Sequence, residues 1–265
     1  MLVRDGDGGI EVCMLRRSHR LVFTPGAYVF PGGALDPADR DPALAARCAG
    51  RDDVAASRLL GLASGGLGFW IAAVRECFEE AGVLLARHDD GTPVAFGDPL
   101  VDSRVRRYRD QLNAGRSTLL DICAGEHLRL DLAPIHYFAH WLTPRPSPRR
   151  YNTRFFVVAM PPDQRPLHDR GELVDDLWIR PADALDRWPD ERDLIRPTRE
   201  CLEAFAGFGA TDELLDAVST MALVPDAQPR MGADGMGVRV LLPGDPGWPS
   251  AHAEAGAAPH AGRDG

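Results

Sequence analysis

Three glutamates close together in one segment are the residues of this chain best suited to carry out chemistry. They stand at positions 76, 79 and 80 of FWIAAVRECFEEAGV, residues 69–83. On a helix that advances 100° per residue they fall at about 0°, −60° and +40°, so Glu76, Glu79 and Glu80 share one face. Three like charges within a turn repel, and no basic residue at helical spacing offsets all three. Mg²⁺ or Mn²⁺, which prefers carboxylate oxygens, would remove the repulsion.

The alternative interpretation of these carboxylates is a solvated helix face, because most charged helix faces simply contact water. The opposite side of the helix is apolar and is predicted to pack into the core. It carries Ile71, Val74, Phe78 and Ala81. Gly82 stands where a left-handed residue would end the helix. We therefore predict an amphipathic helix over residues 69–81, with a candidate metal site on its charged face.

The segment RECFEEAGV, residues 75–83, resembles the second half of the Nudix box, R-E-U-x-E-E-x-G-U, in which U is apolar. The first half of the box begins at Gly33, and Asp39 stands where the family has glutamate. Arg75 lies 42 residues after Gly33 instead of the family's 14, so about 28 residues are inserted. Lengthening a surface loop costs only about 0.6 kcal/mol per doubling of its length. The motif is therefore interrupted, not absent.

The split box most resembles the Nudix subgroup that contains peroxisomal coenzyme A diphosphatases. The segments HWLTP, RRYNTRFF and ELVDDLW fit that subgroup too, and the resemblance covers roughly residues 8–210. An upstream pattern of coenzyme A hydrolases, R-S-x3-R-x3-G-x3-F-P-G-G, is matched in register by Arg17-Ser18, Gly26 and residues 30–33. Val22 occupies the position of its second arginine, so Arg16, Arg20, Arg149 or Arg150 would have to replace that contact.

The resemblance implies roles for the residues of the box. Glu76, Glu79 and Glu80 would bind Mg²⁺ or Mn²⁺, with the backbone carbonyl of Gly32 as a further ligand. The metal would neutralise a diphosphate and lower the pKa of an attacking water. Arg75 would orient a glutamate, because a guanidinium makes two parallel hydrogen bonds to a carboxylate.

Outside the box, the resemblance implies a general base on a later loop, for which Glu172 is the candidate. Asp175 and Asp176 compete with it, and a solvated loop carboxylate is equally compatible. Asp39 is interpreted either as a partner of Arg75 across the insert or as a solvated turn residue.

Arginines near the box could contact the phosphates of a substrate, although arginines in loops usually face solvent. The candidates are Arg17, Arg20, Arg149, Arg150 and Arg154. His136 and His140 lie at i and i+4 of an apolar segment, which places them on one side of a strand. Packing is the favoured interpretation of these two histidines, because a zinc site would need further ligands.

Composition and charge exclude several classes of protein. The net charge of −9 argues against a nucleic-acid binder, which needs a basic surface. The five cysteines are widely spaced without a C-x-x-C pair, so we expect reduced, mostly buried thiols. The first residues do not resemble a signal peptide, no apolar run suits a membrane span, and the end is not Ser-Lys-Leu. We expect a cytoplasmic protein without membrane partners.

The Nudix resemblance implies an α/β/α sandwich around a mixed β-sheet, with an inserted helical segment. We expect a Nudix domain over residues 1–222, an insert at about 40–67, and a poorly ordered extension over 223–265. Strands are predicted at residues 10–17, 28–30, 135–142, 153–160 and 173–179. Helices are predicted at residues 69–81, 104–124, 194–208 and 212–221, with one or two short helices over 41–62 and a helix-starting proline at 181.

The expected function is hydrolysis of a nucleoside diphosphate linked to another moiety, dependent on a divalent metal. The leading small-molecule substrate is coenzyme A or an acyl-coenzyme A, cleaved to 3′,5′-ADP and a 4′-phosphopantetheine product. ADP-ribose and NADH are the next candidates. A Nudix-like module that senses a nucleotide without turning it over is the alternative from another class. A homodimer is compatible with the sequence.

Overall fold

The structure is a computed structural model that describes residues 1–18, 25–143, 151–164, 173–190, 192–220, 226–227, 230–234 and 237–241. It divides into two compact units. The larger unit comprises Met1–Ala139 and Arg154–Val224, and the smaller comprises His140–Thr153 and Pro225–Gly265. No helix among the described residues is long and apolar enough to cross a membrane.

The main sheet is mixed. Its described strands in the larger unit run in the order β7-β8-β1-β2-β3, and β9 also pairs with β2. Their bounds are β1 (Leu2–Gly6), β2 (Gly9–Arg17), β3 (Tyr28–Val29), β7 (His136–Leu142), β8 (Asn152–Ala159) and β9 (Leu173–Ile179). Strand β1 is antiparallel to β2 and parallel to β8. Strands β2, β3, β7, β8 and β9 match the predicted segments, whereas β1 is missed.

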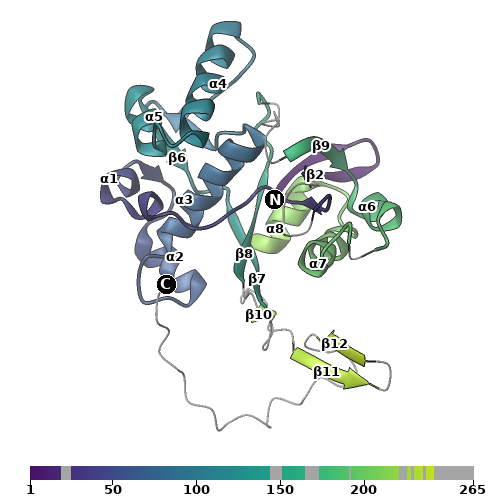
Figure 1. The fold of residues 1–265 in the computed structure, drawn as a ribbon. Helices are drawn as coiled ribbons and strands as arrows, with labels where there is room; N and C mark the ends of the chain where they lie inside the picture. Colours follow the sequence, from purple (N-terminus) through teal and green to yellow (C-terminus); the bar gives the residue numbers. More distant parts are fainter. Residues whose placement is uncertain are drawn as a thin grey trace. The chain divides into compact units, whose positions relative to one another are not determined.

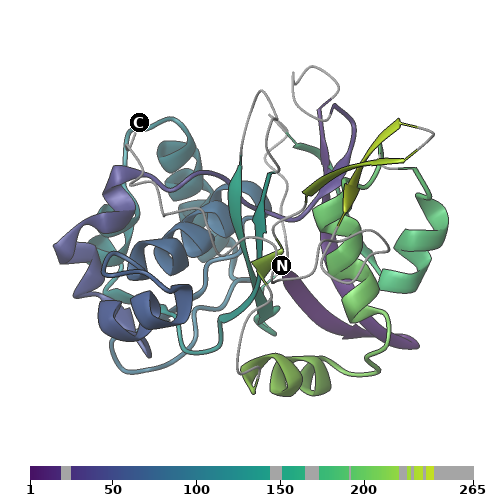
Figure 2. The same ribbon diagram turned by 90° about the horizontal axis from the view of Figure 1, so that it is seen from below.

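Helices cover both faces of this sheet, which gives the predicted α/β/α layers (Figures 1 and 2). Those on one face are α1 (Pro42–Ala45), α2 (Asp53–Leu60), α3 (Leu67–Glu76), α4 (Pro99–Asn113) and α5 (Leu119–Gly125). Those on the other are α6 (Pro181–Arg187), α7 (Arg196–Phe205) and α8 (Thr211–Ser219). Strand β2 alternates between two cores: Cys13 and Leu15 pack with α1–α5, and Val12 and Met14 with α6–α8.

The prediction of one continuous helix over residues 104–124 is wrong. The segment forms α4 and α5, separated by residues 114–118. Thr118 forms a capping box with Asp121, so it starts a new helix where the prediction continued the old one.

The insert packs into the core instead of forming a lengthened surface loop. After the 3₁₀ turn η1 (Pro37–Arg40) it forms the two short helices α1 and α2, as predicted, and also β4 (Cys48–Ala49). Strand β4 belongs to a second sheet of order β4-β6-β5, with β5 (Ala86–His88) and β6 (Leu128–Asp131). Leu44, Cys48 and Ala56 are buried in the same cluster as Trp70 of α3. The insert is therefore part of the domain's framework.

The smaller unit contains short strands that were not predicted. Strand β10 (Asp226–Ala227) pairs in parallel with the end of β7, and β11 (Arg230–Asp234) and β12 (Gly237–Leu241) form an antiparallel hairpin. The domain boundary at residue 222 and the extension over 223–265 stay predictions.

All five cysteines are buried thiols outside any disulfide, as predicted. Their thiols lie among apolar side chains, and burial raises the pKa of Cys77, Cys123 and Cys201 to about 12. They are therefore core residues rather than reactive groups.

Candidate active site

The predicted helix over residues 69–81 forms with one deviation from regular α geometry. Helix α3 continues directly into a π-helical turn, η2 (Cys77–Ala81), and we call the two together the glutamate helix. Gly82 ends it with φ 70°, the left-handed conformation that was predicted. All four residues of the predicted apolar face are buried: Ile71, Val74, Phe78 and Ala81. A π turn is wider than an α turn and often lies at a functional site.

The insert caps the start of the glutamate helix. Gly66 has no side chain to serve the unbonded amides of the first turn. Asp53 accepts hydrogen bonds from the N–H groups of Leu67 and Gly65, both at 2.9 Å, and the Ser57 hydroxyl accepts one from Gly66 at 2.9 Å. The hydrogen bond from Leu67, followed by that from Gly65, lowers the pKa of Asp53 below its ordinary value. A Cβ at residue 66 would collide with the Ser57 backbone, which explains the glycine.

Arg75 joins the two halves of the split motif. Its Nε and Nη2 donate to the two carboxylate oxygens of Asp39, each at 2.9 Å, and Nη2 also donates to the carbonyl of Ala34 at 2.8 Å. Its Nη1 donates to Glu76 Oε1 and to Glu79 Oε2, both at 2.8 Å. Asp39, only 1% exposed, is therefore the partner of Arg75 and not a solvated turn residue.

The loop of the first half-box contacts the remaining carboxylates. The N–H of Gly32 donates to Glu80 Oε2 at 2.8 Å. A Cβ at Gly33 would overlap the carboxylate of Glu76, so this glycine permits the close approach of loop and helix. Asp39, Arg75, Glu76, Glu79 and Glu80 thus meet in one place, which we call the carboxylate cluster.

The carboxylate cluster holds more negative than positive charge. The side chains of Glu76 and Glu79 are only 13% and 20% exposed. Burial raises the pKa of both carboxyls, and the charge of Arg75 opposes that shift. Burial alone would lower the pKa of Arg75, but its hydrogen bond to Asp39 and the neighbouring carboxylates raise it above the ordinary value. Within the cluster as defined, one guanidinium therefore contacts three of the four carboxylates, and a bound cation would offset the remaining negative charge.

The chemistry of these donors fits a hard divalent cation. Glu76 and Glu79 each place one oxygen on Arg75, and each carries a second carboxylate oxygen. Among the residues described, no three carboxylate, imidazole or thiolate groups are already arranged around a common point where an ion would sit. Oxygen ligands of this kind suit Mg²⁺ or Mn²⁺, which usually keeps several waters and needs few protein ligands.

Several predicted residues do not join the carboxylate cluster through any contact described. Arg17 lies in β2, opposite Leu173 of β9. Arg154 stacks its guanidinium over the ring of Phe69, 4.4 Å from the ring centre, in the first turns of the glutamate helix. Arg20, Arg149, Arg150 and Glu172 lie outside the described residues. Asp175 and Asp176 are in β9, opposite Arg16 and Leu15.

The two predicted histidines lie in β7. The His140 ring nitrogen Nε2 is 2.5 Å from the amide oxygen of Asn152 in the smaller unit. His136 is half-buried in the larger unit, and burial, followed by the charge of Arg51, lowers its pKa.

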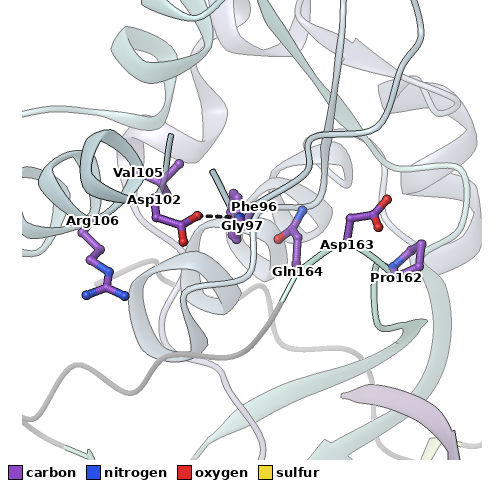
Figure 3. Close-up of a pocket in the computed structure, with 8 residues that line it drawn as sticks. All are labelled: Phe96, Gly97, Asp102, Val105, Arg106, Pro162, Asp163 and Gln164. Atoms are coloured by element: carbon purple, nitrogen blue, oxygen red, sulfur yellow. Dashed lines mark hydrogen bonds between the residues drawn. The ribbon is translucent and has the colours of Figure 1, made fainter. Parts of the chain in front are cut away.

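A separate cavity of about 520 Å³ lies beside α4 (Figure 3). Its lining includes none of the carboxylate cluster: Phe96, Gly97, Asp102, Val105, Arg106, Pro162, Asp163 and Gln164. Asp102 accepts a hydrogen bond from the Gly97 N–H at 2.8 Å (Figure 3). Gln164 is turned inward, where it accepts from the Leu84 N–H and donates to the Leu84 carbonyl, both at 2.9 Å. The buried amide of Gln164 therefore supports the chain just after the glutamate helix.

Sequence reasoning missed Asp53, Ser57 and Gln164, which support the glutamate helix and the chain just after it. It also left the role of Asp39 undecided. Asp53 follows Asp52, which caps α2, so the pair looks like the start of its own helix. Nothing in that pattern indicates that Asp53 serves the next helix as well.

Comparison with known proteins identifies relatives of this chain. The profile of the NUDT19 Nudix domain matches residues 53–199, more than half of the chain. The human acyl-coenzyme A diphosphatase NUDT19 is 32% identical over 208 residues, 66% of this chain and 55% of that protein. Its Gallus gallus counterpart is 29% identical over 222 residues, 71% and 58% of the respective chains. The chain thus spans little more than half the length of these relatives.

The fold itself has a counterpart among solved structures. The crystal structure of a Nudix hydrolase from Alicyclobacillus acidocaldarius superposes with a TM-score of 0.64 at 27% identity, covering 84% of this chain and 95% of that one. The layered fold, the split motif joined through Arg75 and the profile match lead to one conclusion: the chain belongs to the Nudix hydrolase family.

Proposed function

We propose that this protein is a metal-dependent diphosphatase of coenzyme A or acyl-coenzyme A. It would add water across the diphosphate bond and release 3′,5′-ADP and 4′-phosphopantetheine or its acylated form. The carboxylate cluster supports the reaction class, because it offers half-buried oxygen donors, with more carboxylates than cations among its five residues, beside a glycine loop. The names of the relatives, acyl-coenzyme A diphosphatases, support the substrate class.

Each residue of the carboxylate cluster would have a distinct task. Glu76, Glu79 and Glu80 would hold Mg²⁺ or Mn²⁺, with the Gly32 carbonyl as a further ligand. The metal would supply an activated water and charge neutralisation at the diphosphate. Arg75 keeps Glu76 and Glu79 oriented, and the Gly32 N–H does the same for Glu80.

Residues outside the cluster complete the proposal. Glu172 is the proposed general base, which would accept a proton from the attacking water. Phosphate contacts are proposed for Arg17, Arg20, Arg149, Arg150 and Arg154. We further propose a cytoplasmic location, consistent with five cysteines that are buried as thiols. Measurement of the molar mass in solution would reveal a homodimer.

The test is an incubation of purified protein with Mg²⁺ or Mn²⁺ and one substrate at a time. The substrates are coenzyme A, a short and a long acyl-coenzyme A, ADP-ribose and NADH, with products resolved by chromatography. The variant Glu79→Gln/Glu80→Gln removes two ligand charges, and the matched control Glu203→Gln alters an exposed glutamate of α7.

Release of 3′,5′-ADP by the wild type and by Glu203→Gln, lost by orders of magnitude in the double variant, is the expected result. AMP from ADP-ribose or NADH without cleavage of coenzyme A would keep the reaction but overturn the substrate. Binding of one nucleotide without turnover of any substrate would overturn the proposed catalytic activity in favour of a sensing module.

A further inference from the structure

Helix α4 places a buried arginine against the carboxyl end of the glutamate helix. Arg109 is only 7% exposed. Its Nε donates to the carbonyl of Glu79 at 2.8 Å, and its Nη2 donates to the carbonyl of Glu80 at 2.7 Å. Asn113, one turn further along α4, donates to the Glu79 carbonyl at 3.4 Å. Two side chains of α4 thus bond to the backbone of two of the three glutamates.

These two carbonyls would otherwise lack their regular helical donors. In an α-helix the carbonyls of residues 79 and 80 would accept from the N–H groups of Val83 and Leu84. Here the Val83 N–H bonds to the Cys77 carbonyl at 3.4 Å, and the Leu84 N–H bonds to Gln164 Oε1 at 2.9 Å. Arg109 therefore replaces the two missing donors, and its positive charge suits the negative end of a helix.

The contacts of Glu79 and Glu80 are more than those of an ordinary helix cap. The backbone of Glu79 and Glu80 is held by Arg109, while the carboxylate of Glu79 is held by Arg75 and that of Glu80 by the Gly32 N–H. Each glutamate is thus fixed at two points. If the carbonyls were free, the peptide planes of the π turn could rotate and redirect both side chains.

We propose that Arg109 is a positioning residue that fixes Glu79 and Glu80 in the orientation needed to bind the divalent metal. This inference rests on the proposed function, because it assumes that these carboxylates are metal ligands. It extends the site to α4, which lies outside the split Nudix motif.

The test is Mn²⁺ binding to the full chain without substrate, measured by the electron paramagnetic resonance signal of free Mn²⁺. Arg109→Lys keeps the positive charge, but an ammonium group cannot reproduce the two hydrogen bonds that the planar guanidinium donates. The matched control is Arg107→Lys, at an exposed position of the same helix. All measurements are made well below the thermal midpoint of each variant, so that only folded protein is compared.

We expect Arg109→Lys to raise the Mn²⁺ dissociation constant by about 10- to 100-fold, the range for residues that orient metal ligands. Arg107→Lys should bind like the wild type. Wild-type affinity in folded Arg109→Lys would overturn the inference and leave Arg109 a structural cap. If that variant does not fold, Asn113→Ala must raise the constant by about two- to threefold, and no change would overturn the inference.

The same measurements separate this inference from the proposed function. A wild type that neither binds Mn²⁺ nor cleaves any diphosphate refutes the function, and the role of Arg109 with it. A wild type that binds Mn²⁺ and cleaves substrate, beside an Arg109→Lys variant of equal affinity, refutes only the role of Arg109.

Discussion

Substitution of Asp39 by alanine should destabilise the folded domain by about 3–4 kcal/mol. Asp39 accepts two charge-assisted hydrogen bonds from Arg75 at 2.9 Å and one from the Asp36 N–H at 2.8 Å. A bond to a charged group contributes roughly 1.5–3 kcal/mol by itself, but bonds that share one carboxylate do not add. The full loss expected for a broken buried pair, about 3–5 kcal/mol, is reduced because Arg75 keeps Glu76 and Glu79 as partners.

Urea unfolding measures this loss directly. The control Asp186→Ala, at an exposed position of α6, should change the free energy of unfolding by less than about 0.5 kcal/mol. In a double-mutant cycle, Asp39→Ala and Arg75→Ala should show a coupling energy of about 2–3 kcal/mol. A loss below about 1 kcal/mol, or a coupling energy near zero, would refute Arg75–Asp39 as the link between the two half-motifs.

Two further substitutions test the start of the glutamate helix and its contact with the loop. Asp53→Ala should lower the free energy of unfolding by about 1–2 kcal/mol, as for a lost helix cap. The folded pKa of Asp53 is lowered, so this contribution is present above a pH of about 4 and is lost as the pH falls through the folded pKa. In urea titrations at acidic pH, the free energies of unfolding of wild type and variant should therefore converge. Gly33→Ala should reduce turnover by roughly 100-fold while changing stability by less than about 1 kcal/mol, because the new Cβ displaces only the end of the Glu76 side chain. Melting curves measure the stability of Gly33→Ala, and reaction rates measure its turnover. A loss of turnover fully explained by the loss of folded protein would contradict this expectation.

Much of the fold follows from local patterns in the sequence. The 3, 4, 3 spacing of Ile71, Val74, Phe78 and Ala81 predicts the buried face of the glutamate helix, and Gly82 marks its end. Strand β2 is recognisable because residues 10–17 alternate and are rich in strand formers and apolar residues, and both of its faces are covered by helices.

Two of the strands that escaped prediction are short and pair with distant segments. Strand β4 has two residues and pairs with β6 some 80 positions later in the chain. Strand β1 pairs in parallel with β8, with Leu2 opposite Val158. Pairing over such separations leaves no periodic signal in a segment of two to five residues.

The supporting residues of the site escape prediction for a related reason. Asp53 and Arg109 bond to backbone groups, and a backbone acceptor or donor has the same chemistry at almost every position. Arg109 also stands among other arginines of α4, so its residue type does not distinguish it. Only the tertiary structure identifies which arginine reaches the glutamate helix.

The structure also explains how a motif can tolerate an interruption of this length. The two half-motifs must meet within hydrogen-bond distance at Arg75 and Asp39, and a flexible insert would leave that encounter to chance. The insert is folded instead, because Leu44 and Cys48 pack into the core near its start. At its middle, Asp53 serves the first turn of the glutamate helix. Replacing the insert by a short loop would therefore remove the cap of the glutamate helix along with the extra residues, so the interruption has become a structural requirement of the site.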